Sequence, residues 1–295
     1  MTFVNSETVS SLAVGLLSHE LSLVNTVLQV PSNEVAGPHG GKTIINVPQP
    51  RIARIQTRNS TTGVVDDLVH TPIVESPVEF DVEHVYDSAP ITSHDLSLDI
   101  VDFARQVVRP LTAAVGAGAE LQLANKMNSI PVAREVLEAS PGNLDNQIAQ
   151  AVADLDIAKV PMSDRYLAVS PSFAAALTSP ANTKLTDFDG EVASEALRRG
   201  IVGEYRGMVV VKNPLLDGFR ALAYHSSAFA YGSLRPADLP GAFGSSVVTE
   251  QGLSLRSMFL VDATKGLSNC MVSIFAGAAI VDLDRVVALG EDSES

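Results

Sequence analysis

The stretch AGPHGGKT, residues 36–43, has the residue types and spacing that could bind a phosphate. It matches the relaxed pattern of a phosphate-binding loop, with alanine in the first glycine position. Such a loop needs a buried strand before it and a helix after it, because the helix N-terminus and the loop amides face the phosphates. Here Pro48 and Pro50 follow and forbid a helix. The residues favour a turn that begins an extended strand, with nucleotide binding as the minor alternative.

The other patterns that could support catalysis or metal binding are incomplete. Gly116 and Gly118 lack the preceding strand and third glycine of a dinucleotide-binding turn, so close packing against another element explains them better. Asp282 and Asp284 are expected to share the solvated face of a strand, and Cys270 is interpreted as a small core residue. The six histidines show no metal-ligand spacing. We predict no catalytic residues, no metal site and no cofactor.

Composition excludes several classes of protein. One cysteine in 295 residues permits neither a disulfide-stapled scaffold nor a cysteine-based zinc site. A formal charge of −14 argues against a stand-alone nucleic-acid reader. The first basic residue is Lys42, so no secretory or transit leader is expected, and the longest apolar run, 274–281, is shorter than the ~20 residues of a membrane helix. We expect a folded protein of the cytoplasm with no membrane insertion.

The first third of the chain predicts an arm and a long hairpin. Residues 1–34 carry leucines at roughly helical spacing but are too short to form a core, so they are expected to pack on something else. Residues 42–58 predict an extended strand and residues 57–71 a hairpin tip. Alternation of Val78, Phe80 and Val82 with acids predicts the returning strand.

A helical period follows. It predicts one long helix from a cap at Ser97 to about Met127, with a kink at Pro110, which removes a backbone hydrogen bond. The apolar stripe of this helix is Ile100, Phe103, Val107, Leu111, Val115 and Leu121.

The remainder predicts shorter helices and strands. Further helices are expected at 143–158 and 173–177, the second capped by Ser170. A short helix that ends at a glycine is expected between Glu195 and the strand at 208–211. The strands are expected at 166–169, 208–211, 222–230, 253–261, 271–275 and 279–289. The class is α+β without a repeated βαβ unit.

Charge is segregated along the hairpin. Residues 42–58 carry only positive charge, whereas residues 66–102 carry ten acids and no lysine or arginine. The two limbs could attract one another, or the outgoing limb could meet an acidic patch of a neighbouring subunit. The second interpretation places basic side chains of the limb against the acidic start of the long helix in an adjacent copy. The side chains concerned are Arg51, Arg54, Arg58, Asp95, Asp99 and Asp102.

The order of these elements resembles the major capsid proteins of tailed bacteriophages. The resemblance spans residues 20–290 and is carried by the order and spacing of several segments. These are ITSHDLSLDIVDFARQVVRPLTAAV, VADLDIAKVPMSDRYLAVSPSFAAAL, EALRRGIVGEYRGMVVVKN, GLSLRSMFLVDATKG and FAGAAIVDLDRVVAL.

The resemblance implies the HK97-type phage capsid fold, an α+β fold with an N-arm, an extended β-hairpin loop, a spine helix, and peripheral and axial domains. A tip hairpin near Val261 to Cys270, with Asp262 and Lys265, is expected to meet neighbouring subunits. The implied parts are an N-terminal arm at 1–34, the extended loop at 35–93, the peripheral domain at 94–142, the axial domain at 143–244, peripheral strands and tip at 245–271, and a return strand with an acidic tail at 272–295.

The resemblance also implies a function. The chain would be a major head protein that self-assembles as pentamers and hexamers into the icosahedral shell of the virion. The shell would form as a procapsid in the host cytoplasm, mature, and enclose double-stranded DNA without sequence-specific binding. A scaffolding protein and a portal are the implied partners. Self-assembly is also expected on physical grounds, because an arm and hairpin unable to bury their apolar faces internally should bury them on other copies. An encapsulin-like nanocompartment and a nucleotide-binding enzyme using residues 36–43 stay open.

Overall fold

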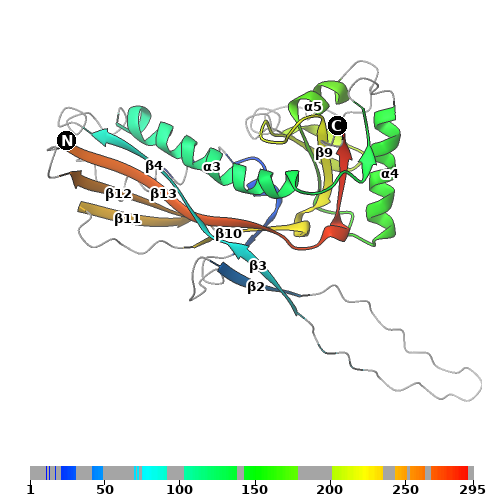
Figure 1. Cartoon of the computed structure of the whole chain (residues 1–295), viewed down its shortest axis with the longest axis horizontal. Coiled ribbons are helices and arrows are strands. Elements are labelled where there is room, and N and C mark those ends of the chain that lie inside the picture. The colour runs from blue at the N-terminus through cyan, green and yellow to red at the C-terminus, as the bar shows by residue number, and fades with distance from the viewer. Residues whose placement is uncertain are drawn as a thin grey trace, which may run out of the picture.

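The computed structural model describes residues 11, 13, 17, 21–30, 42–48, 70, 72, 75–91, 103–137, 143–178, 201–234, 243–250, 253–262 and 267–291. These residues form two six-stranded sheets and a two-stranded ribbon. A long helix lies along the first sheet, two shorter helices flank the second sheet, and the ribbon leaves the body below both (Figure 1).

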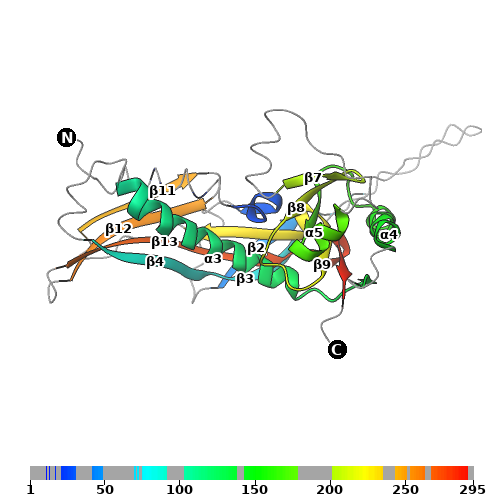
Figure 2. The ribbon, with the colours of Figure 1, turned by 90° about the horizontal axis from the view of Figure 1, so that it is seen from above.

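The first sheet has the strand order β1-β10-β13-β12-β11, and β4 pairs with the other edge of β13. Helix α3 (Arg109–Asn128) runs along β13 and β4 (Figure 2). The strands are β1 (Leu28–Val30), β4 (Glu83–Ile91), β10 (Phe229–Leu234), β11 (Phe243–Glu250), β12 (Leu253–Asp262) and β13 (Leu267–Ile280).

The predicted long helix is confirmed over the residues that the structure describes, from Phe103 to Asn128. It begins with a π-helical turn, η3 (Ala104–Val108), and Pro110 lies directly after this turn. The widened turn contains Gln106, to whose carbonyl the N–H that Pro110 lacks would have bonded. The kink expected at Pro110 stays a prediction. The segment 97–102 lies outside the described residues.

The buried face of α3 differs from the predicted stripe in its second half. Leu111, Val115 and Ala119 are buried, but Leu121 is 46% exposed and Glu120 is only 4% exposed. The prediction for Leu121 was wrong because a helix turns by 100° per residue, and a stripe through Val115 and Ala119 continues to Leu123. An acidic side chain therefore enters the core.

The second sheet has the order β5-β14-β9-β6-β8-β7. Helix α4 (Leu144–Ile157) packs against β14 and β9, and α5 (Pro171–Leu177) is capped by Ser170, whose Oγ accepts the N–H of Phe173 at 3.3 Å. These two helices were predicted and are confirmed. The strands are β5 (Arg134–Glu135), β6 (Arg165–Val169), β7 (Ile201–Tyr205), β8 (Met208–Lys212), β9 (Arg220–His225) and β14 (Val286–Gly290).

The hairpin of β7 and β8 was only half predicted. The strand at 208–211 is confirmed, but the strand β7 was missed. Arg206 and Gly207 both have positive φ, 52° and 77°, which makes the tight turn between the two strands. The helix expected from Glu195 lies outside the described residues.

The ribbon consists of β2 (Lys42–Pro48) and β3 (Glu75–Asp81), paired antiparallel from Lys42 opposite Asp81 to Pro48 opposite Glu75. This confirms the outgoing and returning limbs where the structure describes them, while residues 51–69 of the limb and tip lie outside. Because Lys42 begins a strand, the helix that a phosphate loop at 36–43 requires does not follow it. The returning limb continues past Val82 as β4 and joins the first sheet.

Two predicted strands were wrong in the same way. Residues 222–230 are the end of β9, a 3-10 turn η5 (Ser226–Ala228) and the start of β10, which belong to different sheets. Residues 279–289 are the end of β13, a 3-10 turn η6 (Leu283–Arg285) and β14. Each turn is only three residues long and has an apolar run on either side, so the polar residues Ser226 and Ser227 in η5 and Asp284 and Arg285 in η6 did not divide the predicted strand.

The arm contributes to the core of its own chain. Leu17, Leu21, Leu23 and Val24 are fully buried, and a 3-10 turn η1 (Val24–Thr26) leads into β1, which pairs parallel with β10. The expectation that the arm buries its apolar side chains on other copies was wrong for these residues. Among the described helices, none is long and apolar enough to cross a membrane.

Candidate functional site

The joint between the two sheets gathers most of the buried polar contacts between distant segments. The described chain passes from one sheet to the other after α3, between β9 and β10, and between β13 and β14. The last two connections, η5 and η6, lie side by side, and the N–H of Val281 donates to the carbonyl of Ala228 at 2.8 Å. Contacts between η5 and η6 therefore hold the two sheets together at this point, in addition to a hydrophobic core that contains residues of both sheets.

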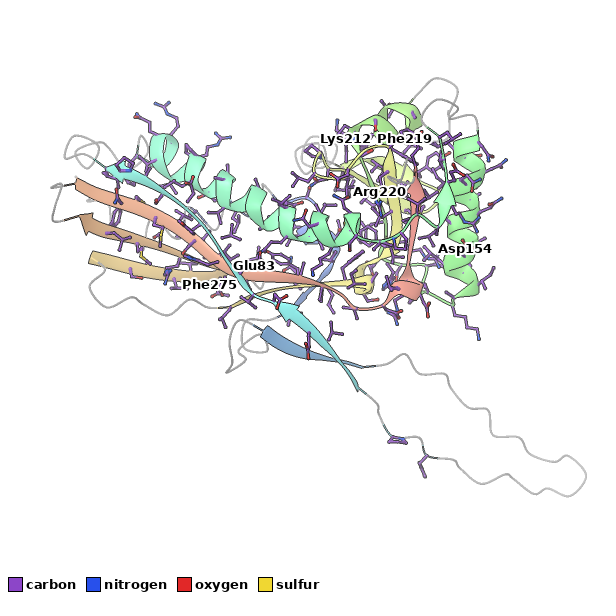
Figure 3. The ribbon with its side chains drawn as sticks, in the orientation of Figure 1. Glu83, Asp154, Lys212, Phe219, Arg220 and Phe275 are labelled. Atoms are coloured by element: carbon purple, nitrogen blue, oxygen red, sulfur yellow. The ribbon has the colours of Figure 1, made fainter. Side chains whose placement is uncertain are left out.

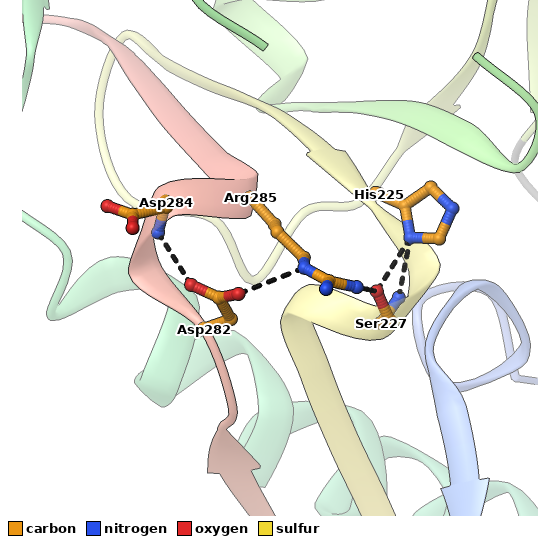
Figure 4. A network of polar contacts seen from close by, with 5 residues as sticks. All are labelled: His225, Ser227, Asp282, Asp284 and Arg285. Atoms are coloured by element: carbon orange, nitrogen blue, oxygen red, sulfur yellow. Dashed lines mark hydrogen bonds and ion pairs between the residues drawn. The ribbon is translucent and has the colours of Figure 1, made fainter. Parts of the chain in front are cut away.

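A polar network joins these two turns (Figure 4). Nδ1 of His225 accepts the N–H of Ser227 at 3.1 Å and lies 2.7 Å from its Oγ. The guanidinium of Arg285 donates to the same Oγ and, through Nε, to Oδ2 of Asp282 at 2.9 Å. Oδ1 of Asp282 accepts the N–H of Asp284 at 3.0 Å. Each turn is thus capped at its start, and Arg285 links the caps.

This network corrects the prediction for Asp282 and Asp284. They do not share a strand face, because they begin a 3-10 turn in which Asp282 is the cap. The arrangement of His225 and Ser227 is not that of a nucleophile and its base, since Nδ1 of the histidine already accepts a backbone N–H.

The opposite side of the joint is formed by the end of α3. Arg220, which is labelled in Figure 3, is only 8% exposed. It reaches from β9 and donates to the carbonyls of Met127 and Ile130. Asn128 donates from Nδ2 to the carbonyl of Leu215 at 3.0 Å and accepts the N–H of Asp217 at 3.2 Å. These bonds tie the end of α3 to β9 and to the segment before it.

Glu120 joins three parts of the chain at one buried point. Its carboxylate accepts the N–H groups of Ser22, Leu23 and Val24 at 2.6, 3.0 and 3.2 Å, at the start of η1. It also accepts Nδ2 of Asn213, which follows β8, at 2.8 Å. Burial raises the pKa of Glu120, and the backbone donors of the arm oppose that effect. The carboxylate connects the arm, the long helix and the second sheet.

Close packing holds α3 on the first sheet. A Cβ at Gly118 would lie 2.5 Å from Cγ1 of Val85 on β4, so the glycine is where the helix approaches the strand, as predicted. Beside it, Nε2 of Gln122 donates to Oε2 of Glu83 at 3.1 Å and to the carbonyl of Ala276 at 3.2 Å. Glu83 lies close to the point where β4 meets β13 (Figure 3).

The predicted contact residues lie mostly outside the described part of the chain. Asp262 is the last residue of β12, opposite Leu267 at the start of β13, so it lies at the end of the hairpin that was expected to be a tip. The others, which the structure does not describe, are Arg51, Arg54, Arg58, Asp95, Asp99, Asp102 and Lys265.

The polar residues of the joint were missed by sequence reasoning. Glu120 directly follows the buried stripe position Ala119, and His225 directly precedes two serines, which are good turn-forming residues. Those were the available signals. Among the described residues, no group of three or more histidine, cysteine or acidic side chains could hold a metal ion.

No model of a protein family matches the chain, and no curated protein matches its sequence. Solved structures match over almost its whole length. A capsid of the cyanophage P-SCSP1u is 13% identical over 91% of this chain and 87% of its own, with a TM-score of 0.54. A capsid of a native GTA particle is 10% identical over 93% and 91%, with a TM-score of 0.55. The SrpI encapsulin of Synechococcus elongatus PCC 7942 is 17% identical over 92% and 88%, with a TM-score of 0.51.

These matches show that the chain has the HK97-type fold, the fold shared by phage capsid proteins and encapsulins. The α+β class and the long helix beside mixed sheets agree with the sequence-based prediction.

Proposed function

We propose that this chain is a shell subunit, and specifically the major capsid protein of a tailed bacteriophage. The observation that carries the proposal is the agreement of the whole fold with capsid structures across more than nine-tenths of the chain. The role is structural, not enzymatic.

The architecture supports assembly from many copies. The ribbon of β2 and β3 extends beyond the body of the chain (Figure 1). Such an element gains stability chiefly by packing on a neighbouring subunit, and many copies of one chain repeat the same few contacts. Pentamers and hexamers are the proposed capsomers, with a scaffolding protein and a portal as partners.

The net charge agrees with an enclosed genome. A formal charge of −14 suits a wall that confines double-stranded DNA without gripping it, since a strongly basic lining would neutralise many phosphates and hold them. The proposed location is the virion, reached after assembly in the host cytoplasm.

The contacts between copies are also proposed. The basic side chains Arg51, Arg54 and Arg58 of the outgoing limb would meet the acidic residues before α3 in an adjacent subunit. The hairpin that contains Asp262 and Lys265 would meet other neighbours.

Electron microscopy and sedimentation of the chain, expressed alone and together with its neighbouring gene products, test the proposal. Closed shells or capsomer rings support a shell subunit. A monomer near 31.1 kDa under both conditions contradicts it.

The contents of shells from native material then separate the two kinds of shell. Double-stranded DNA inside supports a phage capsid. An enclosed protein without DNA supports a nanocompartment, for which the similarity to an encapsulin is the favouring observation.

A further inference from the structure

The joint between the two sheets has one side that ordinary pH changes do not affect and one side that they do. At the end of α3, the contacts come from Arg220, Asn128 and backbone groups, and neither side chain titrates near neutral pH. At η5 and η6, the contacts centre on His225. Of the described histidines, His70, His84 and His225, only His225 belongs to this network.

The contact of His225 with the backbone requires its neutral form, whereas Nδ1 can make its 2.7 Å contact with Oγ of Ser227 in either form. Its Nδ1 accepts the N–H of Ser227, so the lone pair must be free and the ring proton must be on Nε2. Protonation places a hydrogen on Nδ1 that faces this N–H donor. The cap at the start of η5 is then lost, and the new positive charge lies close to the guanidinium of Arg285, which shares Ser227 as a partner (Figure 4).

We propose that η5 and η6 form a hinge between the two sheets, which the contacts of His225, Ser227 and Arg285 hold closed and acid releases. The α3 side stays bonded through Arg220 and Asn128, so release acts on one side of the joint only. This inference rests on the fold and does not require that the chain encloses DNA.

The charged groups around His225 act in both directions. Burial and the charge of Arg285 lower its pKa from 6.5, as does Arg165 at the start of β6, whereas Asp164 raises it. The net direction is downward. Because the closed joint disfavours the charged ring, the joint is most stable above pH 6.5 and weakens as the pH falls below that value.

Two acidic residues also bear on the response of the joint to acid. Asp282 pairs with Arg285 and so limits the repulsion between that guanidinium and a protonated His225. Glu120 lies at the arm and Asn213, and acid would also act on it. The test therefore needs a variant at each site.

Hydrogen exchange measured by mass spectrometry at pH 5 and pH 7.5 tests the proposal on the full chain in its purified assembly state, with rates referred to those of the denatured chain at each pH. We expect protection of peptides covering η5 and η6 to fall about tenfold or more at the lower pH. Peptides from the core of α4 should keep their protection.

His225→Asn is the informative variant, because the asparagine Oδ1 takes the position of Nδ1, caps the turn and does not titrate. It should keep protection at both pH values. His84→Asn, on β4 and outside the network, and Glu120→Gln are the controls and should retain the acid response of the wild type.

Arg285→Gln supplies a second test. It removes a charge that lowers the pKa of His225 in the closed joint, so the change in protection between pH 7.5 and pH 5 should be smaller than in the wild type. Because it also removes the bond to Ser227, protection should be lower at both pH values. The proposal is overturned if the wild type shows no acid response, if His225→Asn responds like the wild type, or if Arg285→Gln responds to acid as strongly as the wild type. Failure to form shells would leave all three readouts intact and would count against the proposed function alone.

Discussion

Nδ2 of Asn213 donates to Oε2 of Glu120 at 2.8 Å, which joins the segment after β8 directly to the middle of the long helix. The same carboxylate accepts three consecutive backbone N–H groups of the arm. An amide at this position keeps one acceptor oxygen but places an NH2 group where the other oxygen lay, so the buried donors that face this group would lose their partner.

Glu120→Gln should therefore lower the free energy of unfolding by about 2–4 kcal/mol, measured by urea denaturation followed by circular dichroism. Glu204→Gln, an exposed glutamate on β7, is the matched control and should change stability little. A double-mutant cycle with Asn213→Leu should show coupling between the two positions. Additive losses would contradict a direct role of the bond between them.

The contact between Gly118 and Val85 predicts an unusual sign. Alanine normally stabilises a helix interior by about 1 kcal/mol relative to glycine. Here the added Cβ would lie 2.5 Å from Cγ1 of Val85, so Gly118→Ala should destabilise the chain by about 1–3 kcal/mol.

Val85→Ala removes the Cγ1 methyl group that the Cβ added at position 118 would contact. The double variant Gly118→Ala with Val85→Ala should recover stability relative to the value expected from adding the two single effects, in thermal or urea denaturation. A single variant Gly118→Ala that is more stable than the wild type would show that α3 and β4 are not in close contact.

A local sequence pattern predicts those parts of the fold that neighbouring residues determine. The helical period located α3 and α4, and the capping residue Ser170 located α5, because these signals come from residues within a turn or two. The crossings at η5 and η6 were missed because each turn is only three residues long and lies between two apolar runs, so its few polar residues did not separate the two strands.

The contact between Glu120 and Asn213 could not be predicted from the sequence, for a different reason. Glu120 and Asn213 are 93 positions apart, and nothing in the neighbourhood of either one indicates the other. Leu121 was assigned to the core and Glu120 was not, since hydrophobicity alone favoured the leucine. The helical phase set by Leu111 and Val115 carried the correct answer.

The buried tyrosines predict an alkaline transition. Oη of Tyr205 donates to Asp145 at 2.7 Å, and burial followed by the contact with this carboxylate raises the pKa of Tyr205 to about 12. Burial also raises the pKa values of Tyr166, Tyr224 and Tyr231. An unfolded chain ionises its tyrosines near pH 10, so folding stability is full below about pH 10 and is lost as the pH rises through about 12.

Parallel titration of phenolate absorbance and circular dichroism checks this expectation. Ionisation of the buried tyrosines should coincide with loss of secondary structure. Asp145→Asn removes a charge that raises the pKa of Tyr205, so ionisation should begin at a lower pH in this variant, and Tyr205→Phe should remove that early phase. Full ionisation near pH 10 with the fold intact would contradict the burial of these rings.

Reversal of the three arginines in the outgoing limb tests the contact proposed between copies. Arg51→Glu, Arg54→Glu and Arg58→Glu together place like charges against the acidic residues before α3, which costs several kcal/mol at each juxtaposition and should reduce assembly about tenfold or more. The yield of sedimenting particles at fixed protein concentration and salt is the measurement. Reversal of the exposed cations Arg109, Lys126 and Lys159 changes the net charge equally and is the control.

A mixing experiment distinguishes contacts between copies from attraction within one hairpin. A second chain carries Asp95→Lys, Asp99→Lys and Asp102→Lys and is defective alone if the contact exists. Mixed with the arginine-reversed chain, it should restore particles, because the acidic limb of one copy then meets the basic residues before α3 in the next. A contact within a single chain stays mismatched in the mixture, so recovery of yield requires that the limb reach a neighbouring subunit. Normal assembly of the arginine-reversed chain alone would refute the contact altogether.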